Sequence, residues 1–196
     1  MRAPFKKLLL LLAKIAFLIF VASMIVVQIP ELEYDLGDRT PVSIGGPEEL
    51  SSNRFPRAVF AAVKGTADFR HRFTYSRYGL TFTYFNLDNY GARLVVRTYE
   101  PVNEQWEKIE LFLGKLRPFK SQAFHYKIRD IYKESFGVDI PEDAFFLGLD
   151  DVPKLSGWQV GAVVFAGILW VVLFYMFFLF RRKKTKPQQT SVSAPR

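Results

Sequence analysis

Residues 158–184 read WQVGAVVFAGILWVVLFYMFFLFRRKK, an uncharged run that ends in four basic residues. As a helix at about 1.5 Å per residue, Trp158–Phe180 would be about 34 Å long. The hydrocarbon core of a bilayer is about 30 Å thick, so this run predicts a transmembrane helix. Trp158 and Tyr175 stand near its ends, as interfacial aromatic residues do, and its cytoplasmic flank consists of Arg181, Arg182, Lys183 and Lys184.

A second apolar run covers residues 8–29 and is interrupted only by Lys14. We interpret it as an uncleaved signal-anchor helix. A cleaved signal peptide is the alternative, because Val21-Ala22-Ser23 offers small residues for cleavage. The apolar run continues through Met24–Val27, which favours the anchor. A helix lying along the membrane surface is disfavoured, since the run has no polar face.

Lys14 is a charge inside this predicted helix, and two interpretations of it are open. Its long side chain can extend back to the cytoplasmic membrane surface. Alternatively, it pairs with the second helix, where Tyr175 would lie at a similar depth if the helices are antiparallel.

The net charge of +8 is concentrated in the two ends of the chain. Residues 1–30 contain four basic residues and residues 181–196 contain six, with no acid in either segment. All 19 acidic residues lie in 31–156, beside 17 basic residues. Basic flanks mark the cytoplasmic side, so both termini are predicted to be cytoplasmic and 31–156 extracytoplasmic. The same placement argues against nucleic-acid binding, and the basic cluster after Phe180 could attract anionic lipid.

These observations predict a membrane protein of a bacterial plasma (inner) membrane, because the Arg- and Ser-rich leader typical of organelle import is absent. We expect a signal-anchor membrane protein with a periplasmic domain. The predicted segments are a basic tail (1–7), a first transmembrane helix (8–29), an acidic Gly/Pro stalk (31–54), a β-rich domain (55–149), a second transmembrane helix (158–180) and a basic, disordered tail (181–196).

Alternating apolar residues predict a mainly antiparallel sheet or small barrel of five to six strands. An amphipathic stripe predicts one packed helix from Phe124 to Phe136, capped by Ser121 and ended by Gly137. The predicted fold class is therefore membrane-anchored α+β. The expected strands are Ala58–Val63, Arg72–Tyr78, Leu80–Leu87, Ala92–Tyr99, Trp106–Leu113 and Lys115–Phe119, with a bulge or bend at Gly114 between the last two. A last extended segment is expected at Val138–Leu149.

The sequence offers little catalytic chemistry. It has no cysteine, which excludes disulfides, thiolate zinc sites and a cysteine nucleophile. Its two histidines, His71 and His125, are expected to be surface or half-buried residues, and no phosphate loop or nucleophile elbow is present. We therefore expect no cofactor, no metal and no enzymatic activity. The alternative is a membrane-bound hydrolase in which carboxylates such as Asp88 and Glu110 meet in a cleft.

Arginine and aromatic residues are interleaved between Phe69 and Tyr99. Such residues stack across strands, which is the structural interpretation. They are also favoured at the centres of interfaces, which predicts a face that binds or scaffolds a membrane or periplasmic protein. A small-ligand or lipid site at the mouth of the sheet is the alternative. The predicted partner-binding residues are Arg77, Tyr78, Tyr84, Arg93, Arg97 and Tyr99.

Four features occur in order: the strand Val59–Gly65, an aromatic strand after Tyr78-Gly79, Val95-Val96-Arg97, and Gly114-Lys115-Leu116-Arg117. With two membrane helices around them, this order resembles the Surfeit-type assembly factors of haem–copper cytochrome oxidase over most of 55–147. The resemblance implies an assembly factor for a membrane complex. The family's Asn-Arg-Gly-Trp signature is replaced by Val96-Arg97-Thr98-Tyr99, and 158–180 contains no histidine, so haem handling is not implied.

Overall fold

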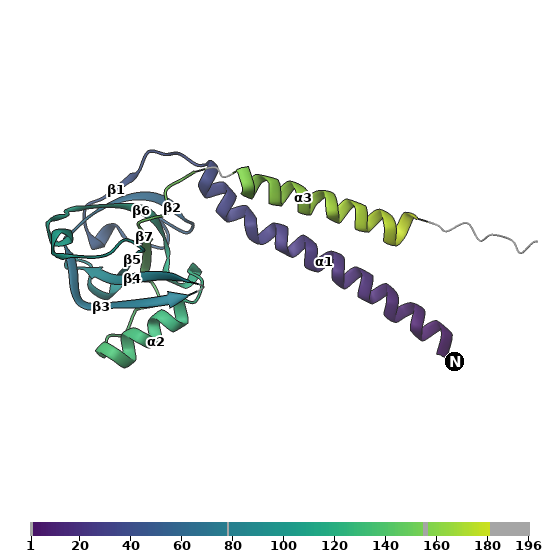
Figure 1. The fold of residues 1–196 in the computed structure, drawn as a ribbon, viewed down its shortest axis with the longest axis horizontal. Coiled ribbons are helices and arrows are strands. Elements are labelled where there is room, and N and C mark those ends of the chain that lie inside the picture. The colour runs from purple at the N-terminus through teal and green to yellow at the C-terminus, as the bar shows by residue number, and fades with distance from the viewer. Residues whose placement is uncertain (1, 78, 155–156, 181–196) are drawn as a thin grey trace, which may run out of the picture. The chain divides into compact units, whose positions relative to one another are not determined.

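The structure, a computed structural model, describes residues 2–77, 79–154 and 157–180. It divides into two compact units, one formed by residues 1–26 and 161–196 and the other by residues 27–160. Figure 1 shows the elements of both units along the chain.

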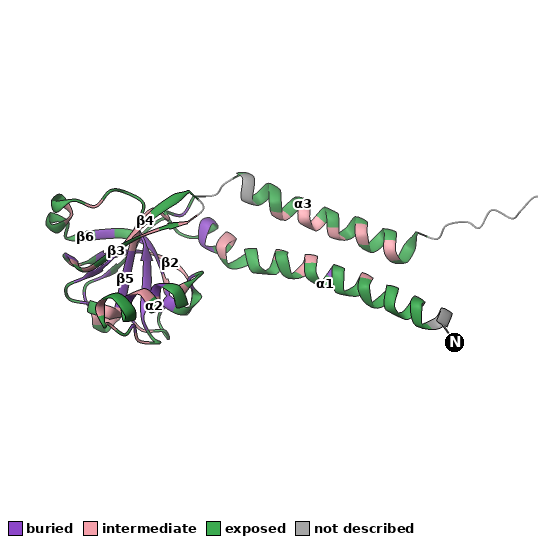
Figure 2. Cartoon of the chain, turned by 60° about the horizontal axis from the view of Figure 1, so that its bottom comes forward, coloured by how far each residue is buried: buried purple, intermediate pink, exposed green. Residues whose placement is uncertain are grey.

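The first unit is helical. Helix α1 runs from Arg2 to Leu36, and α3 runs from Gly157 to Phe174 and continues as a π-helical turn, Tyr175–Leu179. Residues 27–36 of α1 and 157–160 of α3 belong to the second unit. Among the described residues, two segments are long and apolar enough to cross a membrane, Leu8–Leu36 and Val160–Leu179. Most of their large apolar side chains are exposed, as the green ribbons of α1 and α3 show (Figure 2). A helix that is apolar all round needs apolar surroundings.

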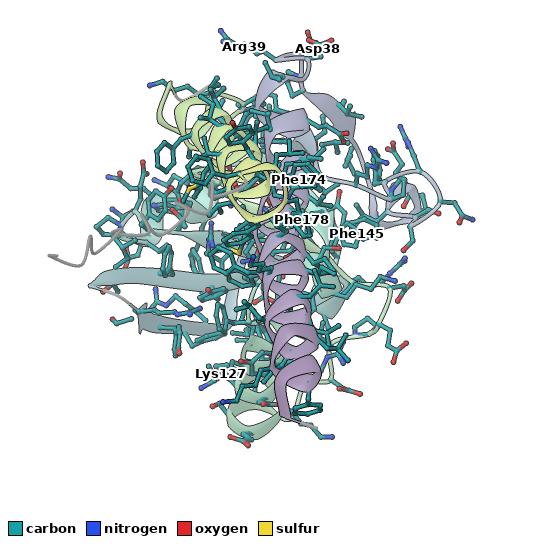
Figure 3. All side chains as sticks on the ribbon, turned by 90° about the vertical axis from the view of Figure 1, so that its right-hand side faces the viewer. Asp38, Arg39, Lys127, Phe145, Phe174 and Phe178 are labelled. Atoms are coloured by element: carbon teal, nitrogen blue, oxygen red, sulfur yellow. The ribbon has the colours of Figure 1, made fainter. Side chains whose placement is uncertain are left out.

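Two polar side chains join α1 to α3 inside this unit. Lys14 Nζ donates to the carbonyl of Phe177 at 3.3 Å, and Trp170 Nε1 donates to the carbonyl of Leu18 at 3.1 Å. Phe177 lies in the last turn of its helix, where carbonyls lack an intrahelical donor. Lys14 therefore reaches the second helix, at Phe177 rather than at Tyr175. On α3, the rings of Phe174 and Phe178 lie one turn apart (Figure 3).

The second unit contains a seven-stranded mixed sheet in the order β1-β2-β6-β7-β5-β4-β3. Two neighbouring pairs are parallel, β1 with β2 and β5 with β7, and the other four are antiparallel. The strands are β1 Val42–Ile44, β2 Val59–Lys64, β3 Ala67–Arg77, β4 Leu80–Leu87, β5 Leu94–Thr98, β6 Leu111–Pro118 and β7 Phe145–Gly148.

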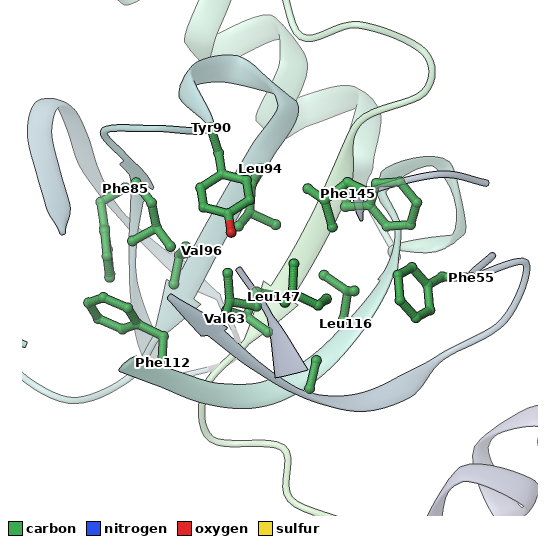
Figure 4. Close-up of a cluster of buried hydrophobic side chains, with 14 of the residues drawn as sticks. Phe55, Val63, Phe85, Tyr90, Leu94, Val96, Phe112, Leu116, Phe145 and Leu147 are labelled. Carbon is green, nitrogen blue, oxygen red and sulfur yellow. The ribbon is translucent and has the colours of Figure 1, made fainter. Parts of the chain in front are cut away.

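The main core lies on one face of this sheet. Side chains such as Val63, Phe85, Val96 and Leu147 are fully buried there and interlock (Figure 4). Because side chains alternate along a strand, the intervening residues face the other way. Those residues form a second cluster with helix α2, His125–Phe136, which lies across that second face beside β3 and β4 (Figure 1).

The observed sheet corrects three expectations. It has seven strands rather than five to six, although it is mainly antiparallel, as expected, with two parallel pairs. Trp106–Leu113 is not one strand, because Asn103 accepts a hydrogen bond from the amide of Gln105 and starts a 3₁₀ turn, Glu104–Lys108, before β6. Gly114 makes no bulge or bend: it lies within β6 in regular pairing with Ala61, and a Cβ there would meet the carbonyl oxygen of Gly148.

The segment expected to be a stalk is largely part of the folded unit. Helix α1 continues to Leu36, and β1 pairs with β2. Ile44 and Leu50 are buried in the main core, which the acidic and glycine-rich composition of 31–54 did not indicate.

An ion cluster fixes the end of α1 to the sheet. Lys115 on β6 is buried, and its ammonium lies 2.5 Å from Glu31, 3.5 Å from Asp151 and 3.9 Å from the centre of the Tyr34 ring. Arg117 pairs with both carboxylates, at 3.1 and 3.5 Å. The carboxylates compensate the charge of the buried ammonium, because transferring an ammonium from water to the protein interior costs on the order of 5 kcal/mol.

Helix α2 begins later than expected and without the predicted cap. Ser121 lies in a separate 3₁₀ turn, Phe119–Ser121, and the N-cap residue is Phe124, which makes no side-chain capping hydrogen bond. Its φ of 63° lies in the left-handed region, which is uncommon for an aromatic residue. The predicted end is confirmed: Gly137 has φ 68° and its amide closes the last turn.

Candidate functional site

An open groove of about 200 Å³ lies between α2 and the ends of β3, β4 and β5. We call it the α2 groove. Aromatic and aliphatic side chains make most of its surface, and three cations join them. Its lining residues are Tyr75, Arg77, Leu80, Phe82, Tyr84, Arg97, Gln122, Ala123, Phe124, Lys127, Ile128 and Ile131.

Strand register explains why these residues share one face. Tyr75 pairs with Phe82 and Arg77 pairs with Leu80, so both pairs point the same way from the β3–β4 hairpin. Tyr84, two residues beyond Phe82, pairs in turn with Arg97 on β5. The groove therefore follows β4 from Leu80 near the hairpin tip to Tyr84 nearer the centre of the sheet.

Arg97 forms the inner end of the groove. Its guanidinium lies 4.9 Å from the centre of the Phe82 ring and 5.3 Å from that of Phe146. Among the described residues it forms no ion pair, and its buried Nε has no hydrogen-bond partner. Burial raises the pKa of the neighbouring Tyr84 hydroxyl, while the charge and hydrogen bond of Arg97 oppose that rise. Tyr84 is therefore a neutral phenol beside a guanidinium at neutral pH.

Arg77 and Phe124 form the outer end. The guanidinium of Arg77 stacks over the Phe124 ring, 3.2 Å from its centre. This contact uses the ring of a residue whose backbone is held in the left-handed region. Residues in sparsely populated conformations tend to cluster at functional sites, because the surrounding structure must hold them there.

The lining carries a net positive charge. Arg77, Arg97 and Lys127 are cationic, and none of the twelve described lining residues is acidic. Lys127 is exposed and extends from α2 (Figure 3). A concave surface with one sign of charge and apolar walls concentrates ligands of the opposite sign. The groove can therefore hold an anion that carries an apolar portion.

The six predicted partner-binding residues do not form one site. Arg77, Tyr84 and Arg97 line the α2 groove. Tyr99 lies beside it, half exposed, with its ring 5.7 Å from Phe82. Arg93 lies elsewhere: it donates to the carbonyl of Leu50 and pairs with Asp143 at 3.6 Å. Tyr78 lies outside the described residues.

The other half of the site comes from α2, which sequence reasoning did not assign to it. Phe124, Ile128 and Ile131 were recognised as an apolar stripe, and a stripe normally indicates core packing. Ile128 does pack in the core, but it also lines the groove together with Phe124 and Ile131. Lys127 precedes Ile128 in the sequence, and it could have indicated that a cation lies beside the apolar stripe.

The residues considered for metal binding or hydrolysis have other neighbours in the described part of the chain. His71 packs against the Phe136 ring, and His125 Nδ1 lies 3.0 Å from the carbonyl of Gln122. No group of three metal-ligating side chains occurs in the part of the chain that the structure describes. Asp88 pairs with Arg70 at 3.3 Å, and neither Asp88 nor Glu110 lines the α2 groove.

Of the residues predicted at the membrane interface, Trp158 lies in α3 and Tyr175 begins its π-helical turn. The basic residues Arg181, Arg182, Lys183 and Lys184 lie outside the described residues.

Comparison of the chain with protein-family models, with curated proteins and with solved structures finds no match.

Proposed function

We propose that the chain is a two-pass integral membrane protein whose extracytoplasmic domain is a non-catalytic binding module, with the α2 groove as its binding site. The two apolar helices and the basic residues at both ends support this topology. Both termini are then cytoplasmic, and residues 31–156 lie outside the cytoplasm of a bacterial inner membrane.

One observation carries the proposed binding role. The α2 groove combines apolar walls with three cations and no acidic lining residue among those described. Binding pockets usually pair an apolar surface with a few polar groups that fix orientation. Here all the charged groups have the same sign, so the bound species is anionic.

A protein partner is a second candidate for this face, as expected for an assembly factor. Tyr99 is exposed beside the groove, next to the exposed lining residue Leu80, and would extend the contact. One side of a stable protein interface usually involves about 20–30 residues. The twelve lining residues alone therefore suit a small ligand better, and a protein partner would have to cover the neighbouring surface as well.

Native mass spectrometry of the full chain, extracted gently from its own membranes, tests the proposal. We expect an anionic species to remain bound to the wild type and to be lost when Arg77, Arg97 and Lys127 are all changed to Gln. A matched control changes three exposed cations outside the groove, Lys64, Lys108 and Lys133, to Gln. Equal occupancy in wild type, variant and control would contradict the proposal, whereas a bound protein lost only in the groove variant would favour the second candidate.

A further inference from the structure

We infer that the ligand of the α2 groove is a small amphipathic carboxylate, with its acidic group at Arg97 and its apolar body directed toward the β3–β4 hairpin. This inference rests on the proposed function and adds the chemical class and orientation of the ligand.

The inner end of the groove suits a carboxylate. It offers one guanidinium, from Arg97, and one neutral hydroxyl, from Tyr84. A single guanidinium has the planar, two-pronged geometry that matches one carboxylate. A phosphate dianion carries more charge than one guanidinium neutralises. The rings of Phe82 and Phe146 flank Arg97 and would exclude water from the resulting ion pair.

Arg97 forms no ion pair with a described residue, and its buried Nε has no hydrogen-bond partner among them. The carboxylate of Asp150 interacts with Arg97 electrostatically, but its hydrogen bonds come from Thr98 Oγ1 and the Tyr99 amide. An unsatisfied donor in a partly buried position destabilises the folded state. A carboxylate on this guanidinium would remove part of that destabilisation.

The walls between the two ends are apolar. Leu80 and Phe82 line one side from β4, and Ile128 and Ile131 line the other from α2. From Leu80 to Tyr84 the groove follows four residues of strand, which is about 13 Å at about 3.3 Å per residue. A body the size of a phenyl ring with a short alkyl linker fits such a length. Arg77 and Lys127 near the opening would attract the acid electrostatically.

The test uses the full chain in nanodiscs of zwitterionic lipid and isothermal titration calorimetry. The probes are 4-phenylbutyrate, its uncharged analogue 4-phenyl-1-butanol, and acetate, which lacks the apolar body. We expect 4-phenylbutyrate to bind at least tenfold more tightly than either analogue. Equal affinity for the alcohol would overturn the role of the carboxylate, and equal affinity for acetate would overturn the role of the apolar walls.

Two variants locate the bound acid. Arg97→Gln should weaken binding of 4-phenylbutyrate at least tenfold, and Lys64→Gln should not. Because Arg97 also stacks on core rings, Ala123→Glu serves as a second variant: Ala123 is an exposed lining residue, so an acid there changes the charge of the groove without disturbing the core. We expect Ala123→Glu to weaken binding at least tenfold more than Ala123→Gln, which has nearly the same size but no charge. The inference would be overturned if neither Arg97→Gln nor Ala123→Glu weakened the binding of 4-phenylbutyrate.

Inorganic phosphate and a short acidic peptide separate this inference from the proposed function. Suppose that Arg97→Gln weakens the binding of phosphate or of the peptide but does not weaken the binding of 4-phenylbutyrate. The groove is then an anion site, and the assignment to a small carboxylate is wrong. If no anionic probe depends on Arg77, Arg97 or Lys127, both the inference and the proposed function are wrong.

Discussion

Lys115 on β6 and Arg97 on β5 flank the same residue, Gly148 of β7, and so stand in one row across the sheet. Tyr84 extends that row on β4. The two cations differ in their neighbouring charges. Lys115 is neutralised by Glu31 and Asp151 and is covered, whereas Arg97 forms no ion pair with a described residue and opens into the α2 groove. The first stabilises the folded domain, and the second is the cation that we propose to bind a ligand.

The Lys115 cluster predicts a strong asymmetry between single and paired substitutions. Glu31→Gln should lower the free energy of unfolding of the domain by about 1–3 kcal/mol, because it leaves a buried ammonium with less compensation. The pair Lys115→Met and Glu31→Leu should recover most of that loss. Thermal unfolding followed by near-ultraviolet circular dichroism measures both. A double variant less stable than the single one would show that the cluster contributes more than charge compensation.

Gly114 and Gly148 lie on neighbouring strands but should respond differently to a methyl group. A Cβ at Gly114 would clash with the backbone carbonyl of Gly148, so Gly114→Ala must push β6 and β7 apart. We expect a loss of about 1–3 kcal/mol, as for overpacked cores. A Cβ at Gly148 would lie 3.5 Å from Arg97 Nη2, an ordinary contact, so Gly148→Ala should change stability by less than about 1 kcal/mol. Chemical denaturation of the two variants compares them, and equal losses would contradict the close approach at Gly114.

The left-handed backbone of Phe124 predicts an inverted preference at the start of α2. Phe124→Gly and Phe124→Ala both remove the ring that stacks under Arg77, so their difference isolates the backbone. Because φ is 63°, the Gly variant should be more stable than the Ala variant by about 1 kcal/mol. Thermal unfolding measures this difference. An Ala variant at least as stable as the Gly variant would mean that α2 starts in another conformation.

Asp68 predicts part of the acid sensitivity of the domain. Hydrogen bonding to Arg70 holds the pKa of Asp68 below its usual value, so folding favours the ionised carboxylate. The stability that this group contributes is present above the pKa of the unfolded chain, about 3.9, and is lost as the pH falls through the lower pKa of the folded state. Melting temperatures measured from pH 6 to pH 2 should therefore fall less steeply for Asp68→Asn than for the wild type. Parallel curves would show that Asp68 is not the responsible group.

The sequence predicted those helices and strands whose pattern lies in residues close together along the chain. Strand β4 was expected and observed at Leu80–Leu87, and the end of α2 at Gly137 follows from glycine's access to positive φ. Residues Trp106–Leu113 alternate in the same way as a strand, but the side chain of Asn103 stabilises a turn there instead. Period-2 alternation over so short a segment does not distinguish the two.

What the sequence did not predict depends on contacts between distant segments. The parallel pairing of β5 with β7 joins Leu94 to Phe145, and no local pattern specifies such a partner. For the same reason, only half of the candidate site was predicted. Arg77, Tyr84 and Arg97 were predicted from the strands. Their arrangement opposite Phe124 and Lys127 depends on where α2 packs, which no local pattern specifies.

The location of the domain relative to the membrane is the claim on which the rest depends, and labelling of single cysteines tests it most directly. The chain has no cysteine of its own, so Ser135→Cys, on an exposed position of α2, and Ser193→Cys, in the C-terminal tail, each provide one reactive thiol. With a membrane-impermeant maleimide and intact spheroplasts, we predict labelling of Ser135→Cys at once and of Ser193→Cys only after permeabilisation. Labelling of Ser135→Cys that requires permeabilisation would place the α2 groove in the cytoplasm and contradict the account.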